Sequence, residues 1–335
     1  MERTRGPRAL VVTVDAEALR HALGAATLTI DGAPTAGGWS NETMFVTADA
    51  RPLVVRLSPS GSAMFPSYDL GLQARCLRYA ASAELPVPTV LTDDDGGLLG
   101  RPFFVMNRLP GRVPADDDPP FTKAGFLFEA TAEQQRTFSL SAIDRLVEIH
   151  RTPSAGFLPV GPSPHAHLRW CADLYGWVDI AQPLLEETHR RLAADVPGGA
   201  DAPTGLLWGD ARPANMLVDE RFAVTGLLDW ELAANGPGEF DVAWFLEMNR
   251  MRSTGMGIAP LPGFLTDAKT WDRWSALIGR PATNIGWYHR YAAYRVAVLL
   301  LLFLRAMISR GRLPHDHRLT RDNLATRRLE SLFGS

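Results

Sequence analysis

The chain is poor in cysteine and lysine, two residues that carry much of protein chemistry. Its 335 residues include only two cysteines, Cys76 and Cys171, and only two lysines, Lys123 and Lys269. Two cysteines far apart in the chain form neither a disulfide framework nor a Cys-x-x-Cys metal site. We expect both to be small buried residues. Any mechanism that needs a lysine must use one of those two positions.

Strong net charge and long apolar runs are also missing. The 34 Lys+Arg and 37 Asp+Glu give a formal charge of −3, which provides no electrostatic basis for binding nucleic acid or an acidic membrane surface. The longest apolar run, residues 296–304, falls well short of the roughly 20 residues that a membrane helix needs, so we expect a buried helix there. Residues 1–20 lack the pattern of a signal peptide. These features predict a cytoplasmic protein, and they leave its oligomeric state open.

Several common nucleotide and hydrolase motifs do not occur. The sequence lacks the P-loop pattern G-x-x-x-x-G-K-[ST], the zinc motif H-E-x-x-H, the G-x-S-x-G elbow and a complete G-x-G-x-x-G. Hydrophobic residues nevertheless make up 46% of the chain and charged residues 21%, as in globular proteins. A chain of this length is expected to form two domains or lobes.

The first third of the chain has the pattern of short strands around one helix. Residues 44–47 and 53–57 are rich in β-formers and flank a turn, which predicts a hairpin. Residues 68–82 have helical apolar spacing. Residues 90–91 and 102–106 flank an Asp- and Gly-rich turn and predict a second hairpin. The predicted order is β-β-α-β-β.

The remaining two thirds are predicted to be mostly helical. The Pro- and Asp-rich stretch 107–120 is the best boundary by composition. Helical spacing follows over residues 141–150, 168–185 and 286–310. The prediction is therefore an α+β protein of two lobes with a cleft between them. Residues 1–108 would form a small antiparallel-sheet lobe with a hinge, and residues 109–335 a larger helical lobe.

Three residues with carboxylate or amide oxygens stand between strand-like segments in the second lobe. Asp210 precedes Asn215 by five positions, and Asp229 follows at the end of the next strand-like run. Phosphoryl transfer needs a base for a hydroxyl proton and oxygen ligands for Mg²⁺. The spacing favours Asp210 as the base and Asn215 and Asp229 as metal ligands, although each alone could be a turn residue.

In this region the sequence resembles the aminoglycoside phosphotransferase family, whose fold is that of the protein kinases. The family's H-G-D-x-x-x-x-N loop has its counterpart in Trp208-Gly209-Asp210 with Asn215, and its metal aspartate in Leu228-Asp229-Trp230-Glu231. The segment 236–244 resembles the family's G-x-P-x-x-D-L-A, which implies that Asp241 braces the catalytic loop. Segments 208–212 and 65–75 are similar to an actinobacterial branch, itself related to the kinase-like domain of acyl-CoA dehydrogenase fusion proteins.

The resemblance also implies a nucleotide site between the lobes for ATP or GTP with Mg²⁺. The base would lie against the hinge and the phosphates under a covering loop and on a strand arginine. The residues that it assigns to nucleotide binding are Gly37, Gly38, Ser40, Asn41, Thr43, Arg56, Met106 and Arg108.

Three positions depart from the family pattern. Arg56 stands where the family has a phosphate-binding lysine, and arginine can still bind phosphate. Gln73 replaces the glutamate that would pair with it; we expect Gln73 to orient Arg56 by hydrogen bonding. Trp208 replaces the loop histidine, and we expect it to pack under the loop. His150 and the His165–His167 pair are interpreted as structural residues.

The sequence thus predicts a kinase acting on a hydroxyl of a small molecule, with Arg212 steadying the γ-phosphate or the substrate. The acceptor could be an aminoglycoside-like antibiotic, as in antibiotic resistance, or a metabolic hydroxyl compound such as a hydroxyacyl thioester. The near balance of charge over residues 151–335 argues against a dedicated site for a polycation. The alternative from another class is a nucleotide-binding pseudokinase that serves as a scaffold or sensor, which Gln73 and Trp208 would favour.

Overall fold

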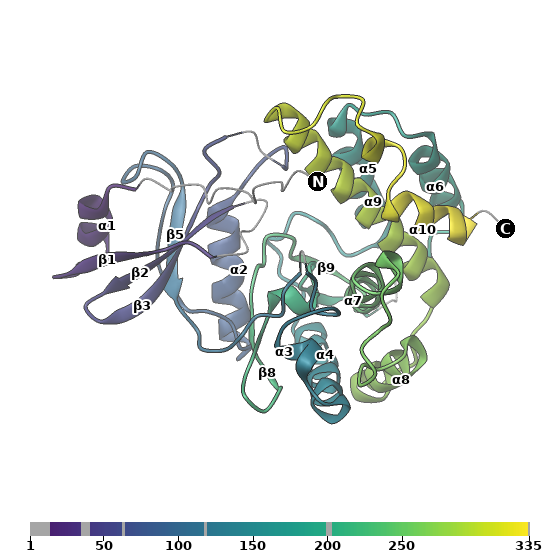
Figure 1. Ribbon diagram of the computed structural model, residues 1–335, viewed down its shortest axis with the longest axis horizontal. Coiled ribbons are helices and arrows are strands. Elements are labelled where there is room, and N and C mark those ends of the chain that lie inside the picture. The colour runs from purple at the N-terminus through teal and green to yellow at the C-terminus, as the bar shows by residue number, and fades with distance from the viewer. Residues whose placement is uncertain (1–13, 35–40, 62–63, 117–118, 199–202, 334–335) are drawn as a thin grey trace, which may run out of the picture.

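The fold has two lobes, a sheet lobe formed by the first third of the chain and a helical lobe formed by the rest (Figure 1). The computed structural model describes residues 14–34, 41–61, 64–116, 119–198 and 203–333. The predicted two-lobed α+β architecture is confirmed. Phe103–Asn107, the last strand of the large sheet, leads directly into the segment that joins the lobes.

The sheet of the first lobe is five-stranded and antiparallel, in the order β1-β2-β3-β5-β4. Its elements include the two predicted hairpins and the predicted helix, together with a first helix and a first strand that extend the predicted order at its start. They are α1 (Ala16–Ala22), β1 (Leu28–Gly32), β2 (Glu42–Ala48), β3 (Arg51–Leu57), α2 (Leu70–Ser82), β4 (Val90–Asp94) and β5 (Phe103–Asn107).

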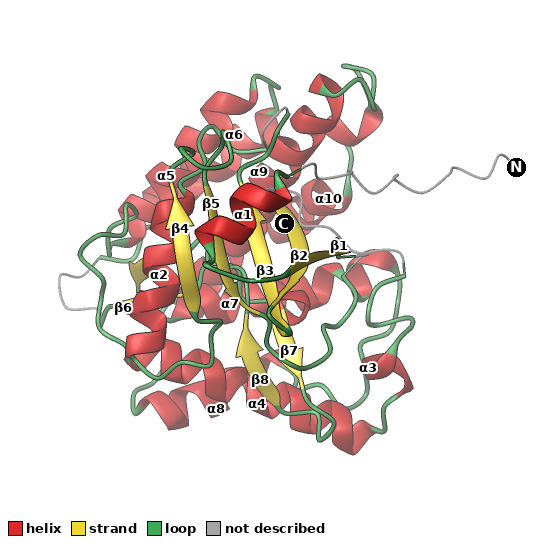
Figure 2. Ribbon diagram, turned by 90° about the vertical axis from the view of Figure 1, so that its left-hand side faces the viewer, coloured by secondary structure: helices red, strands yellow, loops and turns green. Residues whose placement is uncertain are grey.

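The two faces of this sheet have different partners because side chains alternate along each strand. On β3, Val55 faces a small core with Leu19 of α1, whereas Val54 belongs to the main core shared with α2 and the helical lobe. Asp69 caps α2 by accepting a hydrogen bond from the Leu72 backbone N–H. Figures 1 and 2 show α1 and α2 on opposite sides of the sheet. Arg56 follows Val54 by two positions and therefore faces the helical lobe.

The second lobe surrounds two small two-stranded sheets with helices. Its helices are α3 (Phe126–Glu129), α4 (Ala132–Arg151), α5 (Pro164–Val178), α6 (Pro183–Ala194), α7 (Glu239–Met251), α8 (Asp267–Ile278), α9 (Ile285–Ser309) and α10 (Leu324–Phe333), with short 3₁₀ turns at Pro213–Asn215, Thr254–Met256 and Arg318–Thr320. Its strands are β6 (Gly205–Leu207), β7 (Met216–Val218), β8 (Val224–Leu227) and β9 (Ala234–Gly236), and β6 pairs with β9 and β7 with β8.

Two of the helices differ from their predicted bounds. The helix predicted over 168–185 is wrong as a single element, because Asp179 adopts a left-handed backbone (φ 56°) that ends α5 and Pro183 begins α6. The helix predicted over 141–150 begins earlier, where Thr131 and Gln134 form a capping box. The first turn of this helix is polar, so the spacing of apolar residues did not reveal it.

The helix α9 contains the longest apolar run and lies in the core. It is the one helix, among those described, that is long and apolar enough to span a membrane. In the protein, 61% of its most apolar stretch is buried, against α5, α6, α7 and α10. The predicted burial of this run is therefore confirmed, and so is that of the free cysteines Cys76 and Cys171.

Candidate active site

A loop between β6 and β7 carries Asp210 and Asn215, and the segment after β8 carries Asp229. The backbone N–H of Leu228 donates to the carbonyl of Asn215 at 2.8 Å. This bond ties the two segments together immediately before Asp229. The structure thus brings together the three residues that the sequence singled out: Asp210 and Asn215 lie in the loop before the β7–β8 hairpin, and Asp229 lies directly after it.

Both carboxylate oxygens of Asp210 accept hydrogen bonds. The Trp244 indole N–H donates to Oδ1 at 3.0 Å. The Arg212 Nε and the Asn215 amide nitrogen both donate to Oδ2 at 2.8 Å. Three donors from separate residues therefore fix the direction in which this carboxylate points, which is the requirement for a positioned base.

Asp229 combines an unusual backbone with an ion pair across the lobes. Its φ of 58° lies in the left-handed region, where non-glycine residues are uncommon. Its Oδ1 lies 3.3 Å from Nη2 of Arg56 on β3. A strained conformation at this position indicates that the surrounding structure holds the carboxylate toward the sheet lobe.

The donor set of Asn215 and Asp229 fits a Mg²⁺ ion bound together with phosphates. Mg²⁺ usually takes one or two protein oxygens and completes its octahedron with water and phosphate oxygens. Both hydrogen bonds of the Asn215 amide use its nitrogen, so its oxygen is the atom that could ligate the ion. Over the described ranges no group of three or more His, Cys, Asp or Glu side chains could hold a metal alone.

Asp241, at the start of α7, braces the loop that carries Asp210. Its Oδ2 accepts the Trp208 backbone N–H at 2.7 Å, and its Oδ1 accepts that of Gly209 at 2.9 Å. His150 Nε2 also lies 3.3 Å from Oδ2, while its Nδ1 accepts the Trp274 indole N–H. Because an indole nitrogen can only donate, His150 must carry its hydrogen on Nε2 and donate to Asp241.

The same loop requires glycine at position 209 and buries the tryptophan at 208. Gly209 has a φ of +83°, and a Cβ atom there would lie 1.8 Å from the Leu232 carbonyl oxygen. Trp208 is fully buried, and its indole N–H donates to the Leu228 carbonyl at 3.0 Å. Trp208 therefore packs beneath the loop, as predicted, and links it to the segment before Asp229.

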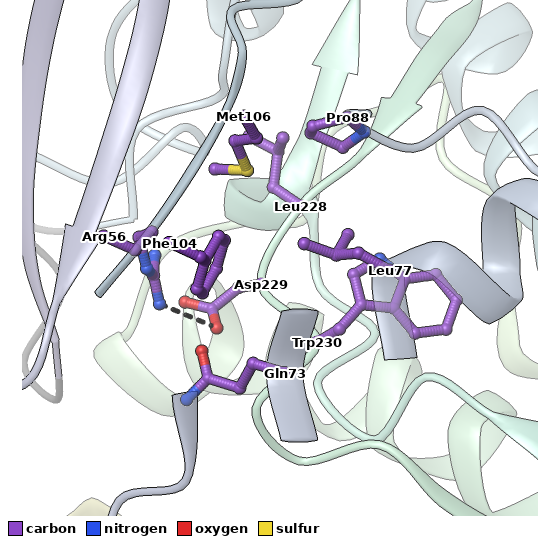
Figure 3. A pocket seen from close by; sticks show the side chains of 9 residues that line it. All are labelled: Arg56, Gln73, Leu77, Pro88, Phe104, Met106, Leu228, Asp229 and Trp230. Carbon is purple, nitrogen blue, oxygen red and sulfur yellow. Dashed lines mark hydrogen bonds and ion pairs between the residues drawn. The ribbon is translucent and has the colours of Figure 1, made fainter. Parts of the chain in front are cut away.

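A pocket between the lobes opens beside Asp229. Side chains from β3, α2, β5 and the segment after β8 point into it (Figure 3). It combines an apolar wall with three polar groups, Arg56, Gln73 and Asp229 (Figure 3). The apolar residues that line it are Leu77, Pro88, Phe104, Met106, Leu228 and Trp230.

Comparison with known proteins agrees with this geometry. Residues 31–277, well over half of the chain, match the sequence model of the phosphotransferase enzyme family, which is abbreviated APH. The chain belongs to this family. It is therefore a small-molecule kinase, and the predicted membership is confirmed.

Solved structures of the family share the fold. A Ralstonia eutropha protein provisionally assigned as an aminoglycoside phosphotransferase superposes with a TM-score of 0.73 at 18% identity, over 96% of both chains. A thermostable aminoglycoside phosphotransferase APH(4)-Ia, in a ternary complex with AMP-PNP and hygromycin B, superposes with a TM-score of 0.59 at 17% identity, over 96% of this chain and 99% of that one. At such low identity these likenesses show the protein-kinase-like fold.

Another relative is a much longer protein, of which only a part matches this chain. Mouse acyl-CoA dehydrogenase family member 10 is 28% identical over 212 residues, which is 62% of this chain. The match covers only 19% of that longer protein. This phosphotransferase chain therefore corresponds to one part of the mouse protein, and the predicted kinship with acyl-CoA dehydrogenase fusion proteins is confirmed.

On the nucleotide side of the phosphotransferase, one predicted contact is wrong. Gln73 does not orient Arg56; its Oε1 instead accepts a hydrogen bond of 3.5 Å from the Asn41 amide, which also donates to Glu231 at 2.7 Å. Arg56 is held by Asp229, and its buried Nε has no hydrogen-bond partner among the described residues. The amide of Asn41 thus takes the place that the prediction gave to the Arg56 guanidinium.

The other predicted nucleotide residues lie at several places around the cleft. Met106 lines the pocket, and Thr43 is opposite Arg56 in the β2–β3 register. The Arg108 guanidinium stacks on the Phe45 ring at 3.9 Å from its centroid, a contact that the hinge assignment did not include. The predicted residues Gly37, Gly38 and Ser40 lie outside the described residues.

Sequence reasoning missed the groups that flank Asp210 on its other side. Arg212 contacts Asp210 and also forms an ion pair with Asp116, which in turn accepts from Arg252 Nε at 2.8 Å. Burial opposes ionisation of Asp116, yet the hydrogen bond from Arg252 and the charges of both arginines lower the pKa of this carboxyl. Asp116 reaches Arg212, and Trp244 reaches Asp210, from distant segments. Trp244 ends the motif-like segment 236–244, but nothing in that pattern assigns it a contact with Asp210.

Proposed function

We propose that this phosphotransferase moves the γ-phosphate of ATP or GTP to a hydroxyl group of a small molecule, with Mg²⁺ as cofactor. The observation that carries the proposal is the convergence of Asp210, Asn215 and Asp229 between the lobes. Phosphoryl transfer asks a protein for positioning and charge stabilisation more than for covalent chemistry. A fixed carboxylate beside two oxygen ligands meets that requirement.

Asp210 would orient the acceptor hydroxyl and receive its proton. The acceptor oxygen forms a bond to the γ-phosphorus, and the bond from that phosphorus to the β–γ bridging oxygen breaks. The nucleoside diphosphate leaves with that bonding pair, while the acceptor proton goes to the Asp210 carboxylate. The donors Trp244, Arg212 and Asn215 keep Asp210 in place through these changes.

Asn215 and Asp229 would hold the metal, and Arg56 would bind the phosphates. Mg²⁺, when bound with the nucleotide, neutralises charge that develops on the β- and γ-phosphates. Arg56 contacts Asp229 directly here, so phosphate oxygens would take the place of that carboxylate on the guanidinium. Arginine can make two parallel hydrogen bonds to phosphate, which supports its use in place of lysine.

The related proteins support two different classes of acceptor. The APH(4)-Ia structure holds hygromycin B and the APH(3'')-Id structure holds streptomycin, which supports an antibiotic acceptor. The acyl-CoA dehydrogenase relative supports a metabolic hydroxyl compound. A pseudokinase remains the competing function, and the absence of a hydrogen bond between Gln73 and Arg56 is the observation that favours it.

A thermal-shift titration with ATP or GTP, each with and without Mg²⁺, tests the proposal. Ligand at about 100 times its dissociation constant should add roughly 2.7 kcal/mol to the stability of the folded protein. We expect a Mg²⁺-dependent rise in melting temperature for the wild type and for the control Asp272→Ala, an exposed position on α8. Asp229→Ala should lose that rise. If neither nucleotide stabilises the wild type, the kinase proposal fails.

A further inference from the structure

Arg295 places a buried positive charge in the middle of α9. The residue is only 7% exposed, and its Nε is buried without a hydrogen-bond partner among the described residues. Its guanidinium lies over two indole rings, 4.4 Å from the centroid of Trp244 and 5.3 Å from that of Trp170. These rings are its contacts in place of a carboxylate.

The groups around Arg295 do not neutralise it. The pKa of His167 falls to about 4, chiefly because burial disfavours its charged form and further because Arg295 is positive. Burial also raises the pKa of the Cys171 thiol to about 12, which keeps it uncharged. Within the described ranges, none of the ion pairs involves Arg295, although many other arginines have one. The carboxylate that acts on the same His167 is Asp241, and its two oxygens are engaged by the backbone N–H groups of Trp208 and Gly209. Arg295 therefore stays without an ion pair among the described residues.

A buried charge without a counter-charge lowers the stability of the folded protein, so the position of Arg295 calls for an explanation. Arg295 stacks on Trp244, and the N–H of that same indole donates to Oδ1 of Asp210. One ring thus separates this charge from the proposed base. The helices that carry the two residues, α7 and α9, pack directly on each other (Figure 1).

Further positive charge flanks Asp210 on the opposite oxygen. Arg212 and Arg252 share the single carboxylate of Asp116, and that carboxylate is already paired by both. Asp229 is likewise paired with Arg56. A polycationic acceptor needs carboxylates that are not already engaged, and Asp116 and Asp229 are both paired. Arg212 and Arg252 are engaged in such pairs as well, so Arg295 is the guanidinium beside Trp244 that, among the described residues, an anionic acceptor would find without an ion pair.

We propose that the acceptor carries an anionic group, a carboxylate or a phosphate, and that Arg295 binds it while the acceptor hydroxyl meets Asp210. The inference rests on the proposed phosphotransferase function, whose acceptor class it narrows. No motif in the sequence assigns a ligand to Arg295. The proposal disfavours aminoglycosides as acceptors.

Three alcohols of equal carbon number separate the possible sources of the charge: glycerol is neutral, glycerate carries a carboxylate and glycerol 3-phosphate carries a phosphate. Each is titrated calorimetrically into the wild type, Arg295→Met and Arg295→Lys, with kanamycin as a polycation. The matched control is Arg305→Met, because Arg305 lies on the same helix and also stacks on an indole, that of Trp177. A parallel titration with Mg²⁺ and ATP tests the nucleotide site separately.

We expect one of the two anions to bind the wild type and the control more tightly than glycerol or kanamycin. Arg295→Met should weaken that binding by about tenfold to a hundredfold, the usual worth of a hydrogen bond to a charged group. Arg295→Lys should retain part of it, and ATP binding should be unchanged in all variants. If ATP does not bind the wild type, the proposed function fails, whatever the anions do.

Two results would overturn the inference while ATP still binds. One is wild-type binding that shows no preference for either anion over glycerol, or no binding of any of the three. The other is equal anion binding by Arg295→Met and the wild type. The melting temperature of Arg295→Met checks the structural alternative: a bracing role for Arg295 predicts a large fall, whereas a ligand-binding role predicts little change or a rise because a buried charge has been removed.

Discussion

The two sides of the active site are held with very different rigidity. On the transfer side, Asp210 accepts from three donors, and Asp241 accepts two backbone N–H groups of the same loop. On the nucleotide side, within the part of the chain that the structure describes, Arg56 makes one polar contact, of 3.3 Å to Asp229, and Gln73 makes one, of 3.5 Å to Asn41. The transfer side is built in advance, whereas the phosphate contacts must rearrange when nucleotide binds.

This difference explains how the chain tolerates its departures from the family pattern. Arg56 and Gln73 replace family residues where contacts are few, and the groups around Asp210 keep a complete hydrogen-bond network. Preorganised groups contribute most where charge moves in the reaction. Substitutions on the transfer side should therefore change rate or stability more than substitutions on the nucleotide side.

Replacement of the proposed base should have the largest effect. Asp210→Asn keeps the shape of the side chain but removes its ability to take the acceptor proton. We expect turnover to fall by about 10²- to 10⁴-fold, the usual contribution of a positioned base, with nucleotide affinity little changed. Steady-state transfer to the best acceptor, with a parallel nucleotide titration, measures both. Turnover within a few-fold of wild type would show that Asp210 is not the base.

Acid should lower the free energy of unfolding through His167, in the core of the helical lobe. This ring is buried against Phe240, and its Nε2–H donates to the Asn235 carbonyl at 2.8 Å. Burial lowers the pKa of His167 from 6.5 to about 4. Between pH 6.5 and about 4, this histidine is therefore protonated in the unfolded chain and neutral in the folded protein. Stability due to this group is complete above pH 6.5 and is lost as the pH falls toward about 4, by about 3 kcal/mol in all.

Urea unfolding of wild type, His167→Gln and the exposed-site control His315→Gln at several pH values isolates that contribution. The His167 variant should lose part of the pH dependence between pH 6.5 and about 4, and the control should keep it. Identical slopes for all three proteins would show that the buried ring does not titrate in this window.

Loss of the Asp241 contacts to the catalytic loop should have the next largest effect. Asp241→Asn places an amide N–H against one of the backbone N–H groups of Trp208 and Gly209, which leaves a buried donor without a partner. We expect a loss of about 1–3 kcal/mol in the free energy of unfolding, together with slower turnover. Asp272→Asn, at an exposed position of α8, is the matched control in the same lobe. An unchanged denaturation midpoint for Asp241→Asn would remove the bracing role.

The smallest of these effects should fall on the nucleotide side. Arg56→Met removes one charged contact to the phosphates, so nucleotide affinity should fall by roughly tenfold. The control Arg78→Met removes an exposed ion pair with Asp93 on the same lobe and should leave affinity unchanged. Equal affinity for wild type and Arg56→Met would mean that the strand arginine does not bind phosphate.

Local pattern predicted the two hairpins and α2 of the sheet lobe but neither α1 nor β1, and it singled out three residues that the structure brings together. The hairpins and α2 follow from alternation, turn residues and helical spacing, and Asp210, Asn215 and Asp229 follow from their spacing. The division between α5 and α6 was missed because it depends on one left-handed residue, Asp179, within an otherwise helical pattern.

The rest of the site depends on contacts between distant segments. Asp116 reaches Arg212 from the connection between the lobes, Trp244 reaches Asp210 from α7, and Arg295 reaches Trp244 from α9. Gln73 turned toward Asn41 because tertiary packing offered an amide partner that the sequence does not reveal. A single sequence contains no local signal for such pairs.

Electron paramagnetic resonance of Mn²⁺, used in place of Mg²⁺, tests most directly whether Asn215 and Asp229 form the metal site of a phosphotransferase. The ion is titrated into wild type, Asn215→Ala and Asp229→Ala, with and without ATP. The structure predicts that wild type binds Mn²⁺ tightly only when ATP is present and that both variants lose about tenfold or more of that affinity. Equal ATP-dependent binding of Mn²⁺ by all three proteins would contradict the account.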